Sequence, residues 1–166
     1  MVSKAAIKRA NETARANRAF GAKAITPRYV LATSNPRDKI LDFGAGPIAM
    51  HTRMLRQAGL NVTAYEFGRN VVAGLHDPNA LYRRYDTVFA SNVMNVQSDL
   101  AMAAETLMCL ARAVKRGGRL IFNYPMSPRY LELPTEELVE FVTELFGVVP
   151  VRVGGTRQAP ILELQF

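Results

Sequence analysis

Residues 39–47 carry the strongest structural signal in the chain and read Lys39-Ile40-Leu41-Asp42-Phe43-Gly44-Ala45-Gly46-Pro47. Their first half is apolar, as in a buried strand, and ends in an acid followed by a turn with two glycines. A helical segment from Ile48 to Ala58 follows, and a second apolar run ends in Glu66. A strand, a glycine turn, a helix and a second strand that ends in an acid commonly hold a nucleoside cofactor.

The glycine turn alone leaves the identity of the nucleoside open. Gly44 and Gly46 lack a Cβ, so the backbone can turn sharply and approach a ligand closely. Pro47 is expected as the first helical residue, where its missing N–H costs nothing, and the helix directs its unpaired N–H groups above the turn. The segment 44–49 also satisfies the dinucleotide pattern G-x-G-x-x-G/A, with Glu66 20 positions after Gly46.

Asp42 favours one class of nucleoside. A carboxylate beside a pyrophosphate would be repelled, whereas a carboxylate beside a cationic amino-acid ligand is attracted. A sulfonium nucleoside with an α-amino group therefore suits this position better than a dinucleotide does. The run Leu41-Asp42-Phe43-Gly44-Ala45-Gly46 resembles the first motif of the class I S-adenosylmethionine-dependent methyltransferases, although Ile48 replaces the third glycine that many of them carry. The chain also resembles small phage-encoded or bacterial methyltransferase-like proteins in its compactness.

The resemblance covers residues 38–166 and implies an α/β fold. This is a doubly wound, Rossmann-like three-layer sandwich with a mostly parallel sheet and an antiparallel closing hairpin at the C-terminus. Tyr85 to Asn92 matches the fourth strand of the family, and Leu75 to Pro78 a remnant of the third strand with its exit turn. Further along, the pattern predicts a helix over 100–116 stopped by Gly117-Gly118, a strand over 119–124, a helix over 135–146, and strands over 148–153 and 161–166.

The cofactor-binding residues that the resemblance implies begin with Asp42, Gly44 and Gly46. Glu66 would accept hydrogen bonds from both ribose hydroxyls, because a carboxylate offers two acceptor oxygens to a vicinal diol. Phe67 would lie against the adenine face, or simply pack in the core. Asp77 would accept from the adenine amino group, or only initiate a turn before Pro78.

Four more residues are assigned to the methionine end of the cofactor. Asn92 and Asn95 would position that end or the methyl acceptor, and these two are the candidate catalytic residues. His51 would face the cofactor carboxylate or solvent, and Tyr29 would close over the methionine end or pack as an ordinary aromatic. Methyl transfer from a sulfonium depends mainly on in-line approach and exclusion of water. Accordingly, no catalytic triad is found in the sequence and no metal site is expected.

Composition limits the organisation of the chain. With 166 residues, of which 49% are hydrophobic, it suffices for one domain with a core. It contains no run of about 18 apolar residues that would span a membrane, and its first nine residues lack an apolar signal core, which predicts a cytoplasmic protein. The lone Cys109 cannot form an internal disulfide and is expected to be buried in packing.

The excess positive charge lies at the N-terminus. Residues 1–39 hold nine basic and two acidic residues, and the rest of the chain is neutral overall. Residues 1–37 are therefore predicted as a basic helical arm, with a helix over 3–20, ahead of a cofactor-binding domain over 38–166. Such an arm is compatible with binding a phosphate backbone and equally with a solvated helix, since no aromatic residues for base stacking accompany it.

Three functional hypotheses follow. The first is a methyltransferase that uses S-adenosylmethionine to methylate a small molecule, a protein or RNA. The second is a protein that binds S-adenosylmethionine or S-adenosylhomocysteine without methyl transfer, by sequestering or degrading it or as a nucleic-acid-binding partner. The third, an NAD-dependent oxidoreductase, is disfavoured because no Tyr is followed by Lys four positions later. The methyl acceptor and the oligomeric state are not specified by the sequence.

Overall fold

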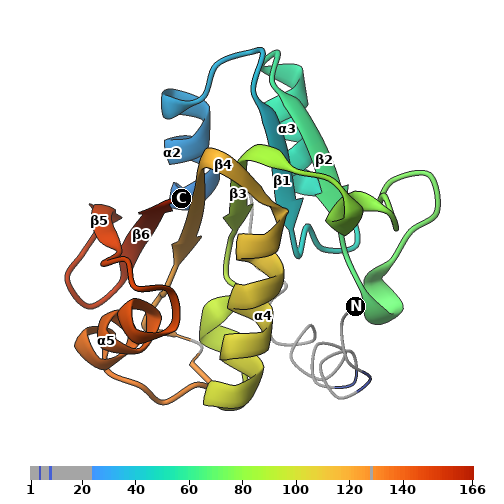
Figure 1. The fold of residues 1–166 in the computed structure, drawn as a ribbon. Coiled ribbons are helices and arrows are strands. Elements are labelled where there is room, and N and C mark those ends of the chain that lie inside the picture. The colour runs from blue at the N-terminus through green and yellow to red at the C-terminus, as the bar shows by residue number, and fades with distance from the viewer. Residues whose placement is uncertain (1–3, 5–7, 9–23, 128) are drawn as a thin grey trace.

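Six strands form one sheet between two layers of helices (Figure 1). The computed structural model describes residues 4, 8, 24–127 and 129–166. The strands are β1 (Lys39–Phe43), β2 (Asn61–Tyr65), β3 (Tyr85–Ala90), β4 (Val114–Asn123), β5 (Val151–Gly155) and β6 (Pro160–Gln165). The helices are α2 (Ile25–Thr33), α3 (Met50–Gln57), α4 (Leu100–Ala113) and α5 (Thr135–Phe146), with short 3₁₀ helices at Gly68–Asn70, Ala80–Tyr82 and Met94–Val96.

The strand order is β2-β1-β3-β4-β6-β5. β1 pairs in parallel with β2 and β3, and β3 pairs in parallel with β4. β6 lies antiparallel between β4 and β5. The mostly parallel sheet with an antiparallel C-terminal hairpin is therefore confirmed.

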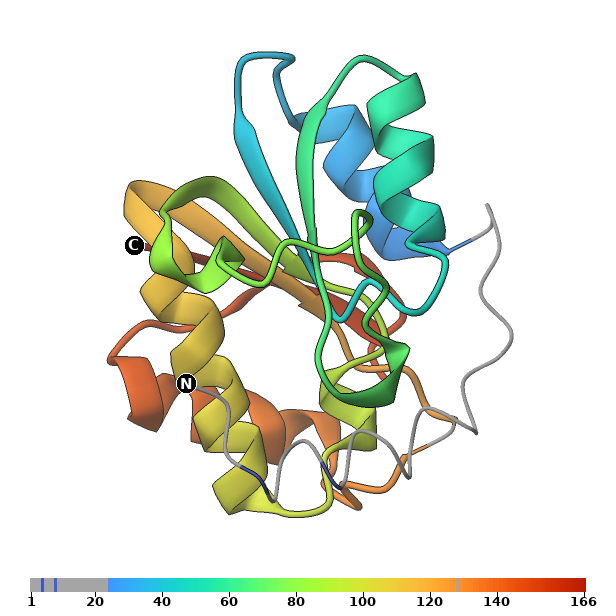
Figure 2. The same ribbon diagram turned by 90° about the vertical axis from the view of Figure 1, so that its right-hand side faces the viewer.

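Alternate residues of the strands serve two separate cores. Leu41 and Phe43 face the layer of α4 and α5, where they join Leu107 and Leu138. Ile40, which precedes Leu41, faces the opposite layer with α2 and α3. Figure 2 shows α2 and α3 together on one side of the sheet and α4 and α5 on the other. This alternation is the pattern of strands buried on both faces, and it confirms the predicted three-layer, doubly wound arrangement.

The helix after the glycine turn begins later than expected. The prediction placed Pro47 in its first turn, but α3 starts at Met50. The reason is that Ala49 adopts the left-handed conformation, with φ of 44°, which a helix cannot contain. Residues 47–49 consequently extend the turn that the glycines begin, and Ile48 is exposed to solvent.

The expected stop of α4 is also wrong. The helix ends at Ala113, and the segment with Gly117-Gly118 is already part of β4 rather than the end of the helix. Two pairings explain this, because Gly117 N–H donates to Phe166 O and Phe166 N–H donates to Gly118 O. A Cβ on Gly118 would lie 2.8 Å from Asp86 O, so Gly118 serves close packing of β4 against β3.

The expected third strand does not form. Residues 75–78 make turns, and β2 is the edge of the sheet formed by the described residues. Asp77 N–H donates to Ala64 O (2.9 Å), and Arg56 Nε donates to Val62 O (2.8 Å). These two bonds satisfy outward-facing carbonyls of β2 that a further strand would otherwise occupy.

Part of the predicted N-terminal arm, residues 25–33, forms α2. α2 packs on the sheet through Thr26, Pro27 and Val30, which are buried. Apart from Lys4 and Lys8, the helix predicted over 3–20 lies outside the described residues, so the arm and its proposed contact with nucleic acid remain predictions. None of the helices in the described part of the chain is long and apolar enough to cross a membrane.

Candidate functional site

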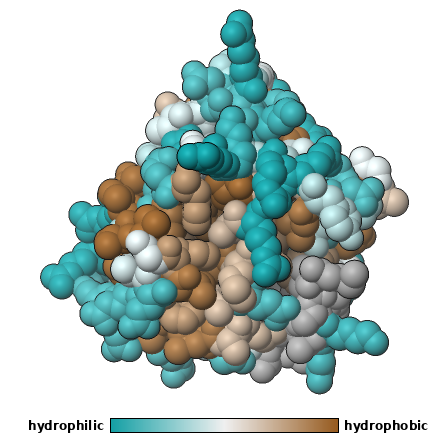
Figure 3. All heavy atoms as spheres, viewed as in Figure 1, coloured by the Kyte–Doolittle hydropathy of each residue, from teal (hydrophilic) through white to brown (hydrophobic). Residues whose placement is uncertain are grey.

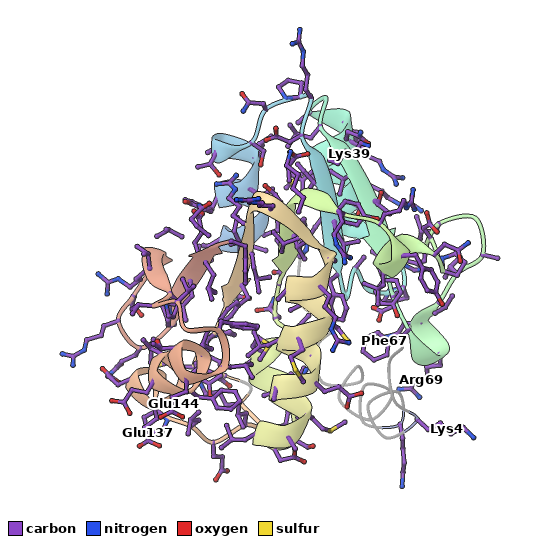
Figure 4. All side chains as sticks on the ribbon, in the orientation of Figure 1. Lys4, Lys39, Phe67, Arg69, Glu137 and Glu144 are labelled. Carbon is purple, nitrogen blue, oxygen red and sulfur yellow. The ribbon has the colours of Figure 1, made fainter. Side chains whose placement is uncertain are left out.

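The candidate site lies at the carboxyl ends of β1, β2 and β3. Figure 4 places Lys39, where β1 begins, at one end of the sheet, and Phe67, just after β2, towards the other. Hydrophilic side chains cover the end at which β1 begins (Figure 3). In open α/β sheets the crevice beyond the carboxyl ends of the strands is where ligands bind.

The glycine turn is fastened to the end of β2. Gly44 N–H and Ala45 N–H both donate to Tyr65 O, at 3.0 and 3.1 Å. Gly44 and Gly46 each have φ of 73°, a conformation that glycine adopts without steric cost. A Cβ on Gly44 would lie only 2.8 Å from Val93 Cγ2, whereas a Cβ on Gly46 would meet nothing within 4 Å. The backbone at Gly46 is therefore open to close approach.

Glu66 holds the glycine turn from the end of β2. Its Oε2 accepts from Gly46 N–H (2.8 Å), and its Oε1 accepts from Phe67 N–H (2.9 Å). Burial raises the pKa of Glu66, while the two N–H donors act to lower it. The acid predicted at this strand end is thus half-buried beside the turn, with one backbone donor on each oxygen.

His76 is a functional candidate that the sequence interpretation missed. Val72 N–H donates to its Nδ1 (2.9 Å), so the ring proton belongs on Nε2, which lies 2.9 Å from Gly46 O and donates to it. The side chain is buried, and it ties the loop after β2 to the turn. The sequence predicts the remnant of a strand over residues 75–78, and a strand there does not indicate a contact between His76 and Gly46.

Asp42 is the next-to-last residue of β1, two positions before Gly44, and is only 1% exposed. Thr52 Oγ1 on α3 donates to its Oδ2 at 2.7 Å. Burial raises the pKa of Asp42 to about 7; the Thr52 hydrogen bond opposes this rise, and the nearby Glu66 adds to it. Arg56 lowers the pKa without offsetting burial, so the charged form of this carboxyl group would gain from a cationic ligand.

His51 and Phe67 follow the carboxyl ends of β1 and β2, in α3 and directly after Glu66. His51, in the first turn of α3, is buried, and its Nε2 has no hydrogen-bond partner among the described residues. Burial also lowers the pKa of His51, which keeps the ring neutral. Phe67 is half-buried and its ring centroid lies 5.9 Å from that of Phe43 and 6.2 Å from that of Tyr65.

Asn92 lies just beyond β3, at φ of 59°, and is partly exposed. Its backbone N–H and its side chain are both bonded to Asn123 at the end of β4. Asn95 is fully buried, and its backbone carbonyl oxygen accepts from Tyr130 N–H at 2.8 Å. Asn92 is therefore partly accessible at the carboxyl end of β3, whereas Asn95 is not accessible to solvent.

The structure engages Tyr29 and Asp77 with other partners. Tyr29 Oη donates to Glu163 Oε2 on β6 (2.9 Å), and the guanidinium of Arg119 lies 6.0 Å from the Tyr29 ring centroid. The carboxylate of Asp77 accepts from Asn79 N–H and pairs with Arg83. The structure thus brings Asp42, Gly44, Gly46 and Glu66 together at one turn and gives Tyr29 a different neighbourhood.

Comparison of this arrangement with known proteins finds relatives by structure only. No protein-family model and no curated protein sequence matches the chain. A methyltransferase from Bacteroides fragilis, in complex with S-adenosyl-L-homocysteine (SAH), superposes with a TM-score of 0.64 and 16% identity, over 86% of this chain and 77% of its own. The sugar N-methyltransferase KedS8 from a Streptoalloteichus species superposes with a TM-score of 0.64 and 16% identity, over 93% of this chain and 91% of its own. DhpI in complex with SAH superposes with a TM-score of 0.65 and 20% identity, over 98% of this chain and 97% of its own.

The chain has the fold of the S-adenosylmethionine-dependent methyltransferases. Its sheet keeps their Rossmann-like arrangement, with the glycine turn at the carboxyl end of β1. Within this methyltransferase fold, Asp42 lies near the end of β1 and Glu66 directly follows β2, close enough for each to act on the glycine turn or on the other's charge. Thr52, His76 and Asn123 then complete the polar surroundings of the crevice.

The two glycines of the methyltransferase turn are expected to differ in their tolerance of alanine. Gly44→Ala combines a left-handed residue with an overlap against Val93 and should cost about 2–4 kcal/mol in unfolding free energy. Gly46→Ala carries only the conformational strain, about 1–2 kcal/mol. Urea unfolding of both variants measures the difference, and equal losses would contradict the close contact of Gly44 with Val93.

Proposed function

We propose that this protein binds S-adenosylmethionine at the carboxyl ends of β1–β3 and transfers the methyl group to an acceptor. The observation that carries the proposal is the buried carboxyl group of Asp42 at the end of β1, two residues before an open glycine turn. An anion in this position favours a ligand with a cationic amino-acid end. The methyltransferase fold and the SAH bound in neighbouring structures support the same assignment.

The residues present fit this cofactor. The open backbone at Gly46 leaves room for close approach, and the charge of Asp42, at the end of β1, would attract the α-amino group. Glu66 retains acceptor capacity for the ribose hydroxyls, since each of its oxygens holds only one backbone donor. Phe67 offers an aromatic surface for the adenine. The neutral, buried His51 has an unpartnered Nε2 and lies in the first turn of α3, next to the glycine turn.

When bound, S-adenosylmethionine supplies an activated methyl group whose leaving thioether is neutral. The protein's own residues then have to orient the two reactants and exclude water rather than supply a strong base. Asn92 and Asn95 are the polar side chains that we assign to the methionine end and to the acceptor side. The described residues hold no group of three or more acidic, His or Cys side chains suited to a metal ion. A small molecule, a protein or RNA remains open as the acceptor class.

Two alternatives lead to different measurements. An NAD-dependent oxidoreductase would have to place a diphosphate over the buried Asp42, which the charge disfavours. A protein that binds S-adenosylmethionine without methylation would use the same site, and only turnover separates it from a methyltransferase. Formation of SAH that depends on an added acceptor pool of small molecules, peptides or RNA supports transfer. Saturable binding without SAH formation in all three pools supports the alternative.

Thermal unfolding with three ligands side by side tests the binding site. A ligand that binds only the native state at about 100 times its Kd stabilises by about 2.7 kcal/mol, which corresponds to roughly 5–10 °C for a chain of this size. S-adenosylmethionine and SAH are each expected to raise Tm in this way, and NAD is not. A rise with NAD alone would overturn the proposal.

A further inference from the structure

Asn123 and Asn92 form a closed pair between the ends of β4 and β3. Asn92 N–H donates to Asn123 Oδ1 at 2.6 Å, and Asn123 Nδ2 donates back to Asn92 Oδ1 at 2.8 Å. Asn123 is 6% exposed, so both bonds are shielded from water on its side. The pair joins two neighbouring inner strands at their carboxyl ends, where the candidate site lies.

The backbone N–H determines the orientation of both amides. Because an N–H can only donate, the atom of Asn123 that faces it must be the oxygen. The Asn123 nitrogen then faces Asn92, which requires the Asn92 oxygen on that side. One lone pair of the Asn92 oxygen is therefore used within the pair, and the orientation of the amide is fixed with its Nδ2 donor on the other side.

The pair also holds Asn92 in an uncommon backbone conformation. With φ of 59°, Asn92 is one of two non-glycine residues with positive φ in the described chain. Asparagine tolerates the left-handed region better than most residues, but the conformation still has to be maintained by its surroundings. The Asn123 Oδ1 supplies such a restraint, since it accepts from the N–H of the left-handed residue itself.

The next residue connects the pair to the glycine turn. Val93 follows Asn92 and lies so close to Gly44 that no Cβ would fit between them. Gln97 Nε2 donates to Val93 O at 2.8 Å and holds the segment from the other side. A change in the backbone of Asn92 would therefore move Val93 against, or away from, the turn over which the cofactor is proposed to lie.

We infer that Asn123 is a positioning residue of the cofactor crevice. It maintains the left-handed backbone of Asn92 and, through Val93, the shape of the glycine turn at Gly44. This inference rests on the proposed function, since it assigns the turn to S-adenosylmethionine. A direct ligand contact of Asn123 is not required, because its amide is used within the pair.

Substitutions at Asn92 and Asn123 separate a backbone role from a side-chain role. Asn123→Leu removes both bonds and is expected to weaken SAH binding about tenfold or more. Asn92→Ala loses the side chain and also disfavours the left-handed backbone, whereas Asn92→Gly loses the side chain but accepts that backbone. Asn92→Gly should therefore retain at least about threefold more SAH affinity than Asn92→Ala. Isothermal titration calorimetry measures all three variants.

Tyr85→Phe is the matched control for general destabilisation. It removes a buried hydrogen bond, from Tyr85 Oη to Ala80 O (3.0 Å), at the opposite end of β3. Its Tm should fall while its SAH affinity stays within about twofold of the unaltered protein. The inference is overturned if Asn92→Gly and Asn92→Ala lose equal affinity, if Asn123→Leu binds normally, or if Tyr85→Phe weakens SAH as much as Asn123→Leu. Failure of the unaltered protein to bind SAH would instead reject the proposed function, and this inference with it.

Discussion

Asp42→Asn is expected to stabilise the ligand-free protein at pH 8 and to weaken its binding of SAH. The Asp42 carboxylate is 1% exposed, and burial raises its pKa to about 7, so at pH 8 the folded protein holds a desolvated negative charge. Asparagine keeps an oxygen that can accept from Thr52 Oγ1 but carries no charge. We expect a gain of about 2–4 kcal/mol in unfolding free energy and a loss of about 10- to 100-fold in SAH affinity.

The stability difference has a defined pH dependence. The ordinary pKa of this carboxyl is 3.8, and the folded value is about 7. Below pH 4 both the folded and the unfolded states are protonated at Asp42, so the substitution changes little. Between pH 4 and pH 7 the unfolded state releases the proton while the folded state keeps it, so the stability of the unaltered protein falls as pH rises. The advantage of Asp42→Asn should therefore appear across this range and level off above pH 7.

Denaturant titrations at several pH values measure this effect, with Asp86→Asn as the control. Burial acts to raise the pKa of Asp86, but Lys115 and the N–H of Lys39 outweigh it, so the pKa is lowered. Asp86→Asn should consequently destabilise at pH 8 and leave SAH affinity unchanged, since Asp86 lies at the opposite end of β3 from the crevice. If Asp42→Asn binds SAH normally, the central charge argument for the cofactor fails.

The elements predicted well are those whose signal is local. The apolar run into Asp42 and Gly44 specifies β1 and its turn, and the start signal at Thr135 with the stop at Gly147 specifies α5, because each signal lies within one segment. The boundaries that were wrong depend on distant partners. Gly117-Gly118 resembles a helix stop, but in the fold these glycines pair with Phe166, the last residue of the printed sequence, 48 positions beyond Gly118.

The same distinction applies to the site. Asp42 and Glu66 could be predicted because each ends a strand beside the glycine turn. Asn123 could not, because its partner Asn92 is 31 residues away and no local pattern marks either amide as half of a pair. His76 was missed since its role depends on a loop that replaces a strand, and the pairing of Asp77 N–H with Ala64 O that permits this loop is a tertiary contact.

Glu66→Gln is expected to weaken SAH binding by about 100-fold, because charge-assisted hydrogen bonds to the ribose would be lost. Each Glu66 oxygen accepts one backbone N–H, from Gly46 and from Phe67. A glutamine has only one oxygen. Its amide NH₂ group would therefore lie against one of the two backbone N–H groups, where neither can accept a hydrogen bond. The substitution should therefore also cost about 1–3 kcal/mol of unfolding free energy.

Two comparisons separate the ribose contact from the loss of stability. Asp86→Asn also removes a carboxylate oxygen from a backbone N–H, that of Lys39, but at the other end of the sheet, and should leave SAH affinity intact. An SAH analogue without the 2′ and 3′ hydroxyls should bind the unaltered protein weakly, and Glu66→Gln should weaken it far less than it weakens SAH. Equal weakening of both ligands would mean that Glu66 acts only by holding Gly46 and the turn. A carboxylate that binds the diol favours SAH over the analogue, and this preference must fall once the second acceptor oxygen is gone.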